Sequence, residues 1–131
     1  ILLNKMDGKM NNLISVVVTC YNHEKYIEQC LRSVFKQTYQ NIELIVLDDG
    51  STDGSKQIIL KTLKDSPFEV KFESHKNMGV VKTRNKGIEL INGKYFLFVD
   101  SDDYLPDDYV EELYSCAINQ QADIVYCDLF G

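Results

Sequence analysis

Several features of other protein classes are absent from this sequence. Its longest apolar runs, such as residues 42–47 with Glu43 inside, are far shorter than the roughly 18–20 residues that a membrane-spanning helix needs. Residues 1–3 are too short an apolar stretch for a signal peptide, and nothing that resembles a cleavage site follows them. The 131 residues, 44% of them hydrophobic and 26% charged, fit one ordinary globular domain.

Residues that commonly bind zinc are few. The four cysteines are Cys20, Cys30, Cys116 and Cys127. They form no Cys-x-x-Cys pair, and two histidines are too few to complete a zinc site. Because the cysteines fall in apolar patterns, we predict buried free thiols in a reducing compartment, and we expect a cytoplasmic protein. His23 and His75 lie in loop-like contexts without a partner at metal spacing, so we interpret each as a surface residue.

Basic residues are absent from the last part of the chain. Residues 95–131 contain nine acidic residues and no lysine or arginine, whereas residues 1–94 contain eleven acidic and fourteen basic residues. A segment this acidic argues against binding of nucleic acid or anionic lipid at its surface. It is compatible with a site that collects a cation.

From residue 13 onward, apolar runs alternate with helical spacing. We expect strands at residues 13–18, 42–47, 69–73, 95–99 and 123–127, and helices at 24–37, between 53 and 67, at 80–91 and at 106–120. This alternation predicts an α/β fold of three layers, α/β/α, with a mostly parallel central sheet and right-handed crossovers. Residues 1–12 show no periodicity, and we interpret them as a tag, linker or flexible arm before a domain at 13–131.

Polar residues cluster where the expected strands end. The clusters are residues 19–22, 48–51, 74–79 and 100–103. In open α/β sheets, ligands bind beyond the carboxyl ends of the strands, where the strand order reverses. We therefore predict that the four clusters contribute to one site.

The most informative cluster follows the apolar residues 95–99. Asp100, Asp102 and Asp103 come directly after this expected buried strand. Ionised carboxylates at one place raise each other's pKa, and a divalent cation relieves their repulsion. Hard oxygen ligands favour Mg²⁺ or Mn²⁺ over zinc. The alternative is a solvated acidic turn before a helix. A calcium loop is excluded because Leu105 stands where that loop requires glycine.

A second acidic pair, Asp48 and Asp49, leaves another expected buried strand and precedes Gly50. A carboxylate here can accept hydrogen bonds from a base imide or a ribose hydroxyl, and glycine permits close backbone approach. The alternative is a turn in which Ser51, Thr52 or Asp53 caps the following helix.

Side chains that suit a flat ring or an anion complete the candidate set. Tyr21 can stack on a ring and Thr19 can hydrogen-bond to one, although both also suit a protein core. Lys82 or Arg84 can face an anion from one side of a helix, or both can lie on a solvated helix face. The chain has neither a Gly-x-Gly-x-x-Gly motif nor a phosphate-binding lysine loop.

Five motifs together resemble a known family in order and spacing. They are Val-Val-Val-Thr-Cys-Tyr-Asn-His-Glu-Lys-Tyr-Ile (16–27), Ser-Val-Phe-Lys-Gln-Thr-Tyr (33–39), Leu-Asp-Asp-Gly-Ser-Thr-Asp (47–53), Asn-Met-Gly-Val-Val-Lys-Thr-Arg-Asn-Lys-Gly (77–87) and Val-Asp-Ser-Asp-Asp (99–103). This set resembles the N-terminal, nucleotide-sugar-binding part of family 2 glycosyltransferases, which have the Rossmann-like GT-A fold. The resemblance covers about residues 13–127.

The resemblance implies roles for particular residues at the nucleotide. Thr19, Tyr21 and one or both of Asp48 and Asp49 would hold the base, which in this family is most often uracil. Arg84 would lie near the base or the phosphates.

The resemblance also implies a metal centre. Asp100 would contact the ribose side, and Asp100 and Asp102 are the expected metal residues. Asp102 would bind the Mn²⁺ or Mg²⁺ that bridges the diphosphate, and such a metal stabilises the charge that develops as the sugar–phosphate bond breaks.

Family members usually transfer a sugar with inversion to a saccharide or lipid-linked acceptor, often in cell-surface polysaccharide or glycan synthesis. Their catalytic base and acceptor-binding residues lie beyond the position that corresponds to residue 131. We therefore expect this chain to be the donor-binding part, truncated on its C-terminal side, and to bind a nucleotide with metal but transfer little or no sugar. Membrane proximity would come through the missing part, and a homodimer is compatible with this interpretation.

Two other classes remain open from the sequence. One is a non-catalytic nucleotide-sugar-binding or assembly module, against which the intact Asp100 and Asp102 argue. The other is a nucleotidyltransferase, which would normally show a glycine-rich basic loop early in the chain. Residues 13–22 contain none.

Overall fold

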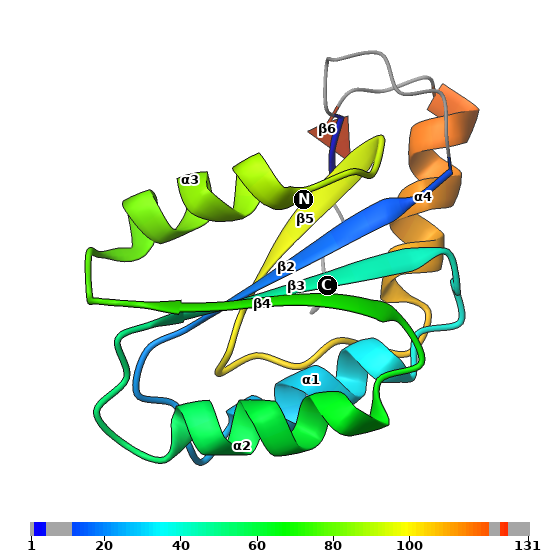
Figure 1. The fold of residues 1–131 in the computed structure, drawn as a ribbon. Helices are drawn as coiled ribbons and strands as arrows, with labels where there is room; N and C mark the ends of the chain where they lie inside the picture. The colour runs from blue at the N-terminus through cyan, green and yellow to red at the C-terminus, as the bar shows by residue number, and fades with distance from the viewer. Residues whose placement is uncertain (1, 5–11, 121–123, 126–131) are drawn as a thin grey trace.

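A computed structural model of the chain describes residues 2–4, 12–120 and 124–125 (Figure 1). The elements are β1 (Leu2–Asn4), β2 (Ile14–Cys20), α1 (Ile27–Phe35), β3 (Ile42–Asp49), α2 (Ser55–Thr62), a short 3-10 helix (Leu63–Asp65), β4 (Glu69–His75), α3 (Val80–Leu90), β5 (Tyr95–Asp100), α4 (Tyr109–Gln120) and β6 (Ile124–Val125). Among the described residues, none of the helices combines the length and apolar character needed to cross a membrane.

All strands join one sheet, in the order β4-β3-β2-β5-β1-β6. Strand β2 pairs in parallel with β3 and β5, and β3 pairs in parallel with β4. Strand β1 runs antiparallel to its neighbours β5 and β6. The sheet is therefore mostly parallel, as the sequence predicts, and its order reverses at β2, with β3 on one side and β5 on the other.

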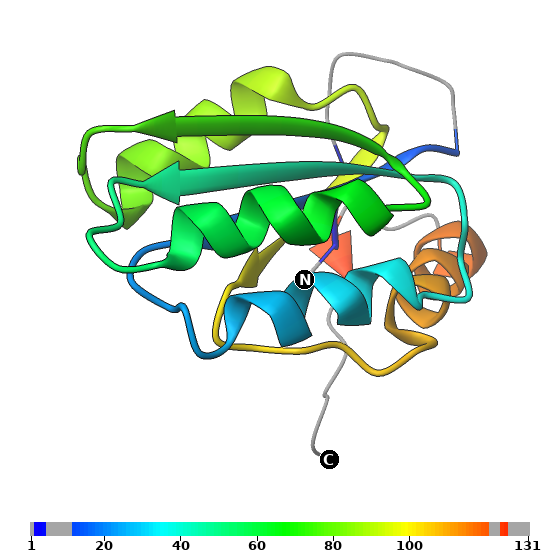
Figure 2. The same ribbon diagram turned by 60° about the horizontal axis from the view of Figure 1, so that its bottom comes forward.

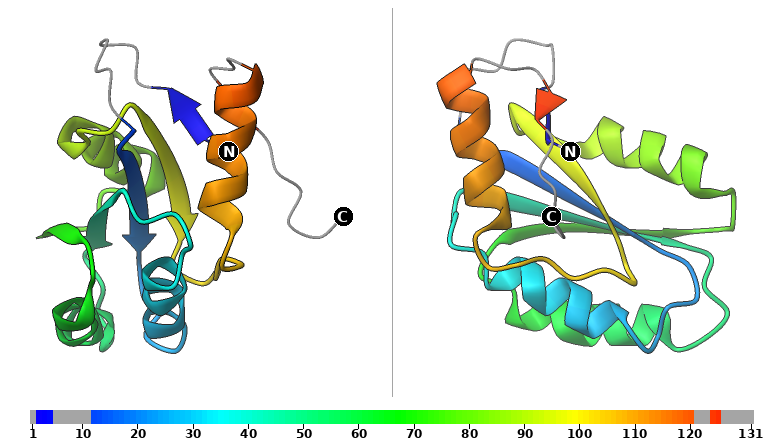
Figure 3. Two further views of the ribbon diagram at one scale, coloured as in Figure 1. Left: turned by 90° about the vertical axis from the view of Figure 1, so that its right-hand side faces the viewer. Right: turned by 180° about the vertical axis from the view of Figure 1, so that it is seen from behind.

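Helices cover both faces of the sheet (Figures 1 and 2). Helices α1, α2 and α4 contribute to the larger core cluster, which includes Val16 and Val18 of β2 and Leu97 of β5. Helix α3 covers the opposite face, where the neighbouring Val17 belongs to a smaller cluster (Figure 3). Strands β2 and β3 are buried along their whole length, which explains why their apolar residues 16–18 and 44–47 are consecutive rather than alternating.

Helix α3 approaches the sheet closely at Gly87. A Cβ atom at this position would lie 2.7 Å from Val17 Cγ1 and 3.1 Å from Leu47 Cδ1. Glycine inside a helix costs about 1 kcal/mol relative to alanine. The close packing that it permits brings α3 against β2 and β3.

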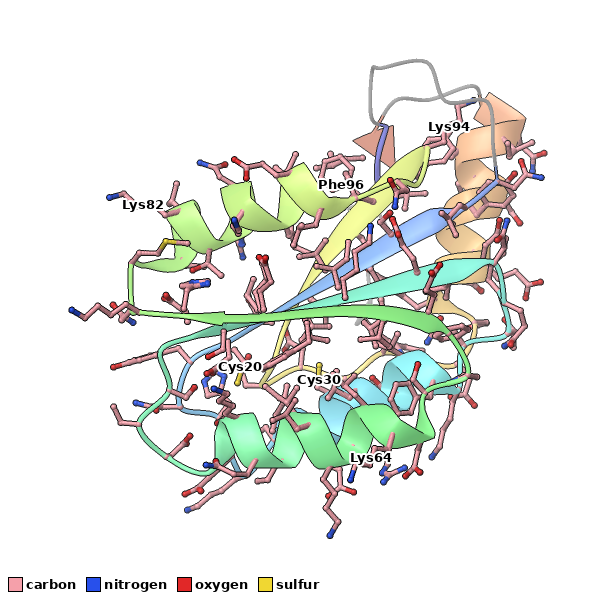
Figure 4. All side chains as sticks on the ribbon, viewed as in Figure 1. Cys20, Cys30, Lys64, Lys82, Lys94 and Phe96 are labelled. Atoms are coloured by element: carbon pink, nitrogen blue, oxygen red, sulfur yellow. The ribbon has the colours of Figure 1, made fainter. Side chains whose placement is uncertain are left out.

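The cysteine prediction holds for two residues and is wrong for one. Cys20 and Cys30 are free and buried, between the sheet and α1 (Figure 4). Cys116 is free but exposed, because α4 buries Leu113 and Ala117 and turns Cys116 away from that buried face. Cys127 lies outside the described residues.

Some elements differ from the sequence-based expectation. Strand β1 (Leu2–Asn4) lies where no strand was expected, since three residues show no periodicity. Helix α4 begins at Tyr109 rather than near Pro106, whose carbonyl accepts a hydrogen bond from Tyr109 N at 3.1 Å in the preceding turn. Strand β4 extends to His75, two residues beyond the expected end. Residues 123, 126 and 127 of the last expected strand lie outside the described residues.

Candidate functional site

A pocket of about 210 Å³ opens at the carboxyl edge of the sheet, where the strand order reverses. Its lining comes from β2 and the loop after it, the end of β3, the start of α3 and the end of β5. The lining residues are Thr19, Cys20, Tyr21, His23, Asp49, Val80, Thr83, Asp100 and Asp102. Strand register explains the assembly, because Thr19 of β2 pairs with Asp100 of β5. Most of the sequence-predicted site residues therefore come together here.

A larger hollow of about 400 Å³ lies beside the end of β4. It is lined by Glu73, Ser74, His75, Met78 and Lys86. Glu73 and Lys86 form an ion pair at 3.8 Å there. The smaller pocket is the candidate site, because the carboxylate cluster and the reversal of strand order meet at it.

The three acids at the end of β5 and in the turn after it converge as predicted. Asp100, Asp102 and Asp103 each offer a carboxylate oxygen, and these oxygens lie within 4.8 Å of one another. The turn that brings them together is closed by Asp103 N, which donates to the Asp100 carbonyl at 3.0 Å. Partial burial, followed by the charges of Asp102 and Asp100, raises the pKa of Asp103. Carboxylate oxygens this close to one another repel, and they are the hard ligands that a divalent cation such as Mg²⁺ or Mn²⁺ prefers.

Arg84 reaches this cluster from α3. Its Nη2 lies 3.4 Å from Asp100 Oδ1, and its guanidinium carbon lies 5.3 Å from the centre of the Phe98 ring. The side chains of Arg84 and Asp100 are 40% and 50% exposed, so this pair adds little to stability. Lys82 on the same helix points away from the molecule (Figure 4), so of these two candidates Arg84 is the one that faces the acidic cluster.

The carboxylate of Asp49 is buried and builds the loop before α3. It accepts hydrogen bonds from Met78 N at 2.8 Å, Gly79 N at 3.1 Å and Asn77 Nδ2 at 3.3 Å. His75 Nε2 lies 3.1 Å from it and completes four polar contacts. Asp49 thus satisfies backbone N–H groups of the loop that leads into α3, which begins at Val80. Helix α3 has no side-chain cap hydrogen bond, so Asp49 holds the loop before the helix rather than capping it.

Asp48 lies on the opposite face of β3 from Asp49, because successive side chains of a strand alternate. It is 2% exposed, and its Oδ2 accepts a hydrogen bond from Ser74 Oγ at 3.3 Å. Its Oδ1 is buried without a hydrogen-bond partner among the described residues. Of the two acids, Asp49 lines the pocket and Asp48 does not.

Thr19 and Tyr21 differ in exposure although both line the pocket. Thr19 is buried at the end of β2, and its carbonyl accepts a hydrogen bond from Ser101 N at 3.2 Å. Tyr21 is 46% exposed, so it is not a core residue and its ring is open to a ligand.

Asn22 joins the loops that follow β2 and β3, a role that the sequence analysis missed. Its φ of 54° lies in the left-handed region, which asparagine tolerates. Its Oδ1 accepts hydrogen bonds from Thr52 N at 2.8 Å and Asp53 N at 3.3 Å. Glu24 adds a second link, because its Oε2 accepts a hydrogen bond from Gly54 N at 2.9 Å. These contacts fix one wall of the pocket.

The interpretation of both histidines as surface residues is wrong. His23 lines the pocket, and its Nδ1 lies 2.5 Å from Ser101 Oγ. His75 contacts Asp49, and its side chain is 20% exposed. Both partners are distant in sequence, so only the paired parallel strands that bring them together could have revealed these roles.

Comparison with known proteins identifies the family. Residues 15–131 match the model of Glycosyl transferase family 2, and the chain belongs to this family. The fold is that of GT-A glycosyltransferases.

Individual relatives agree with this assignment. The chain is 42% identical over 115 residues to "Glycosyltransferase GlyA" of Streptococcus pneumoniae serotype 4, covering 88% of this chain and 16% of that protein. It is 39% identical over 95 residues to "Teichoic acid poly(glycerol phosphate) polymerase" of Staphylococcus epidermidis, covering 72% and 13%. The structure resembles that of S. aureus TarS in complex with UDP-GlcNAc, with a TM-score of 0.75, 34% identity and coverage of 82% and 32%. The chain therefore spans only a minor part of these proteins.

Proposed function

We propose that this chain is the donor-binding part of a metal-dependent glycosyltransferase that uses a UDP-sugar. The observation that carries the proposal is the convergence of the carboxylate oxygens of Asp100, Asp102 and Asp103 beside a pocket at the point where the strand order reverses. A nucleoside diphosphate and a divalent cation together fit such a site. The similarity to TarS, whose structure was solved with UDP-GlcNAc, supports uracil as the base.

In this proposal each part of the pocket has a task. The exposed ring of Tyr21 stacks on the base, and Thr19 and Asp49 border the space that the base would occupy. Asp100 and Asp102 hold Mn²⁺ or Mg²⁺, and the bound ion offsets the negative charge of the diphosphate. Arg84, already turned towards Asp100, supplies a positive charge near the phosphates.

The wider role follows the family and its relatives. We propose transfer with inversion to a saccharide or lipid-linked acceptor in cell-surface polysaccharide synthesis, which the similarity to a teichoic acid polymerase supports. Transfer with inversion needs a general base, which in this family is usually a carboxylate, and we assign this role to no described residue. The free buried thiols of Cys20 and Cys30 favour a reducing compartment, so we propose the cytoplasm, with the inner face of the membrane as the place of transfer to a lipid-linked acceptor.

Calorimetric titration with UDP, and with GDP for comparison, tests the proposal. The proteins are the wild type, Asp102→Ala and Asp108→Ala. Asp108→Ala is the control, because it removes an exposed acid outside the pocket. We expect UDP to bind in the presence of Mn²⁺ and to lose at least about tenfold in affinity in Asp102→Ala. Asp108→Ala is expected to bind like the wild type. Binding of UDP that is equally tight without metal, or in Asp102→Ala, would contradict the proposed metal role, and absence of nucleotide binding would contradict the donor site.

A further inference from the structure

His23 connects the loop after β2 to the acidic turn after β5. Its Nδ1 lies 2.5 Å from Ser101 Oγ, within hydrogen-bond distance whichever atom donates. Ser101 is fully buried and stands between Asp100 and Asp102 in the sequence. His23 therefore contacts the one residue of the turn that the two expected metal residues flank.

His23 is held at its backbone as well as at its ring. His23 N donates to Ser55 Oγ at 3.0 Å, at the first residue of α2. The His23 carbonyl accepts hydrogen bonds from Tyr26 N at 3.0 Å and Ile27 N at 2.9 Å, at the start of α1. Its ring also meets the Tyr26 ring edge to face, with centroids 6.2 Å apart and an interplanar angle of 78°. The starts of α1 and α2 thus hold His23, the residue that contacts Ser101.

Ser101 is held at its backbone as well as at its side chain. Its N–H donates to the Thr19 carbonyl at 3.2 Å, so β2 fixes one end of the turn. Each residue has only two soft backbone dihedrals, and fixing Ser101 restricts where the flanking carboxylates can point. Without such restraint, repulsion would drive the carboxylate oxygens apart.

We propose that His23 is a positioning residue, which holds Ser101 and thereby keeps the carboxylates of Asp100 and Asp102 in the arrangement that binds a divalent cation. This inference rests on the proposed function. Groups that orient metal ligands without touching the metal typically change metal affinity by about 10–100-fold when they are removed. The expected effect of breaking the contact is therefore at least about a tenfold loss of Mn²⁺ affinity.

The test is a titration with Mn²⁺ in the presence of UDP, in which electron paramagnetic resonance measures how much of the ion is bound. The variants are His23→Ala, Ser101→Ala, their double variant, His23→Asn and His23→Gln. The side-chain amide of asparagine reaches the position of Nδ1, whereas that of glutamine reaches the position of Nε2. His23→Asn can therefore keep the contact with Ser101, and His23→Gln serves as the matched variant that cannot.

We expect His23→Ala, His23→Gln and Ser101→Ala each to weaken Mn²⁺ binding about tenfold, and the double variant to bind no more weakly than either single one. His23→Asn is expected to stay within about threefold of the wild type. A merely structural role would instead show as a lower melting temperature without metal and as additive losses.

Four outcomes would overturn the inference. If the wild type binds Mn²⁺ and the alanine variants bind it equally well, His23 does not position the turn. The same conclusion follows if His23→Asn loses as much affinity as His23→Ala, or if the losses add in the double variant. If the wild type itself binds no Mn²⁺, both this inference and the proposed metal site fail, whereas the other results leave the metal site intact. Should His23→Ala fail to fold, Ser101→Ala and His23→Asn carry the test.

Discussion

At the scale of single residues, neighbouring acids at one strand end have different surroundings. Asp49 makes four polar contacts with residues 75–79, whereas Asp48 has one hydrogen bond and one oxygen without a partner among the described residues. A buried carboxylate that satisfies several donors is expensive to replace, since each donor left unpaired costs about 1–3 kcal/mol. Asp49 is therefore a structural residue of the loop as well as a wall of the pocket.

This difference predicts unequal effects of two adjacent substitutions. Asp49→Asn replaces an acceptor oxygen with a donor that faces backbone N–H groups, so we expect the free energy of unfolding to fall by about 2–3 kcal/mol. Asp48→Asn removes the charge of a carboxylate whose Oδ1 has no hydrogen-bond partner among the described residues. We expect this variant to lower the free energy of unfolding by less than about 1 kcal/mol. Urea denaturation of both variants without nucleotide measures this, and a larger loss in Asp48→Asn would refute the assignment.

The same contacts show what the sequence could not reveal about individual residues. Asp49 and its partners Met78 and Gly79 are separated by 29 and 30 positions, and His23 and Ser101 by 78. Residue type and local pattern identified the carboxylates as functional candidates, because acids rarely end buried strands. They could not identify His23, since its role depends on a contact that exists only after β2 and β5 have paired.

At the scale of elements, the end of the sheet opposite the pocket is held by a buried glutamate. Glu43 of β3 accepts hydrogen bonds from Ser15 Oγ at 2.5 Å, Asn92 N at 2.5 Å and Gly93 N at 3.2 Å, and Lys71 Nζ lies 3.5 Å away. This carboxylate ties β3 to β2, to β4 and to the connection between α3 and β5. Burial alone would raise the pKa of Glu43, but the hydrogen bonds and the lysine outweigh it and lower the pKa.

A lowered pKa makes this stabilisation dependent on pH. The charged form of Glu43 is favoured in the folded state, so its contribution is complete above the ordinary glutamate pKa of 4.5 and is lost as the pH falls through the lower folded value. We expect Glu43→Gln to reduce the free energy of unfolding by about 2 kcal/mol at neutral pH. Denaturation between about pH 7 and about pH 3 should show the gap between variant and wild type shrinking below pH 4.5, and a constant gap would contradict this explanation.

Element prediction from the sequence succeeded where one physical pattern dominated. The buried runs of β2, β3 and β5 and the amphipathic spacing of α1 identified these elements, because burial on both faces or on one helix face leaves a regular pattern. Strand β1 was missed since its three residues gain their structure from pairing with β5 and β6, which come much later in the chain. The start of α4 was misplaced because the turn after Pro106 precedes the first helical residue.

At the scale of the whole molecule, the two ends of the parallel strands differ. The candidate site lies at the carboxyl end, and contacts that stabilise the fold lie at the other end. Parallel strands bring the ends of β2, β3 and β5 to the pocket, and the Glu43 contacts lie at the opposite end. The fold class and the convergence of the acidic motifs could be predicted from the sequence, because both follow from the alternation of strands and helices. The identity of the acceptor could not be predicted, because no described residue is assigned to acceptor binding.

The central claim is that the turn after β5 binds a divalent cation together with a UDP-sugar. Diffraction at the manganese absorption edge, from crystals of this chain grown with UDP and Mn²⁺, tests it most directly. We predict an anomalous peak in bonding contact with a carboxylate oxygen of Asp102 and with the diphosphate. Bound UDP without a peak at Asp100 or Asp102, or a peak elsewhere on the protein, would contradict the claim.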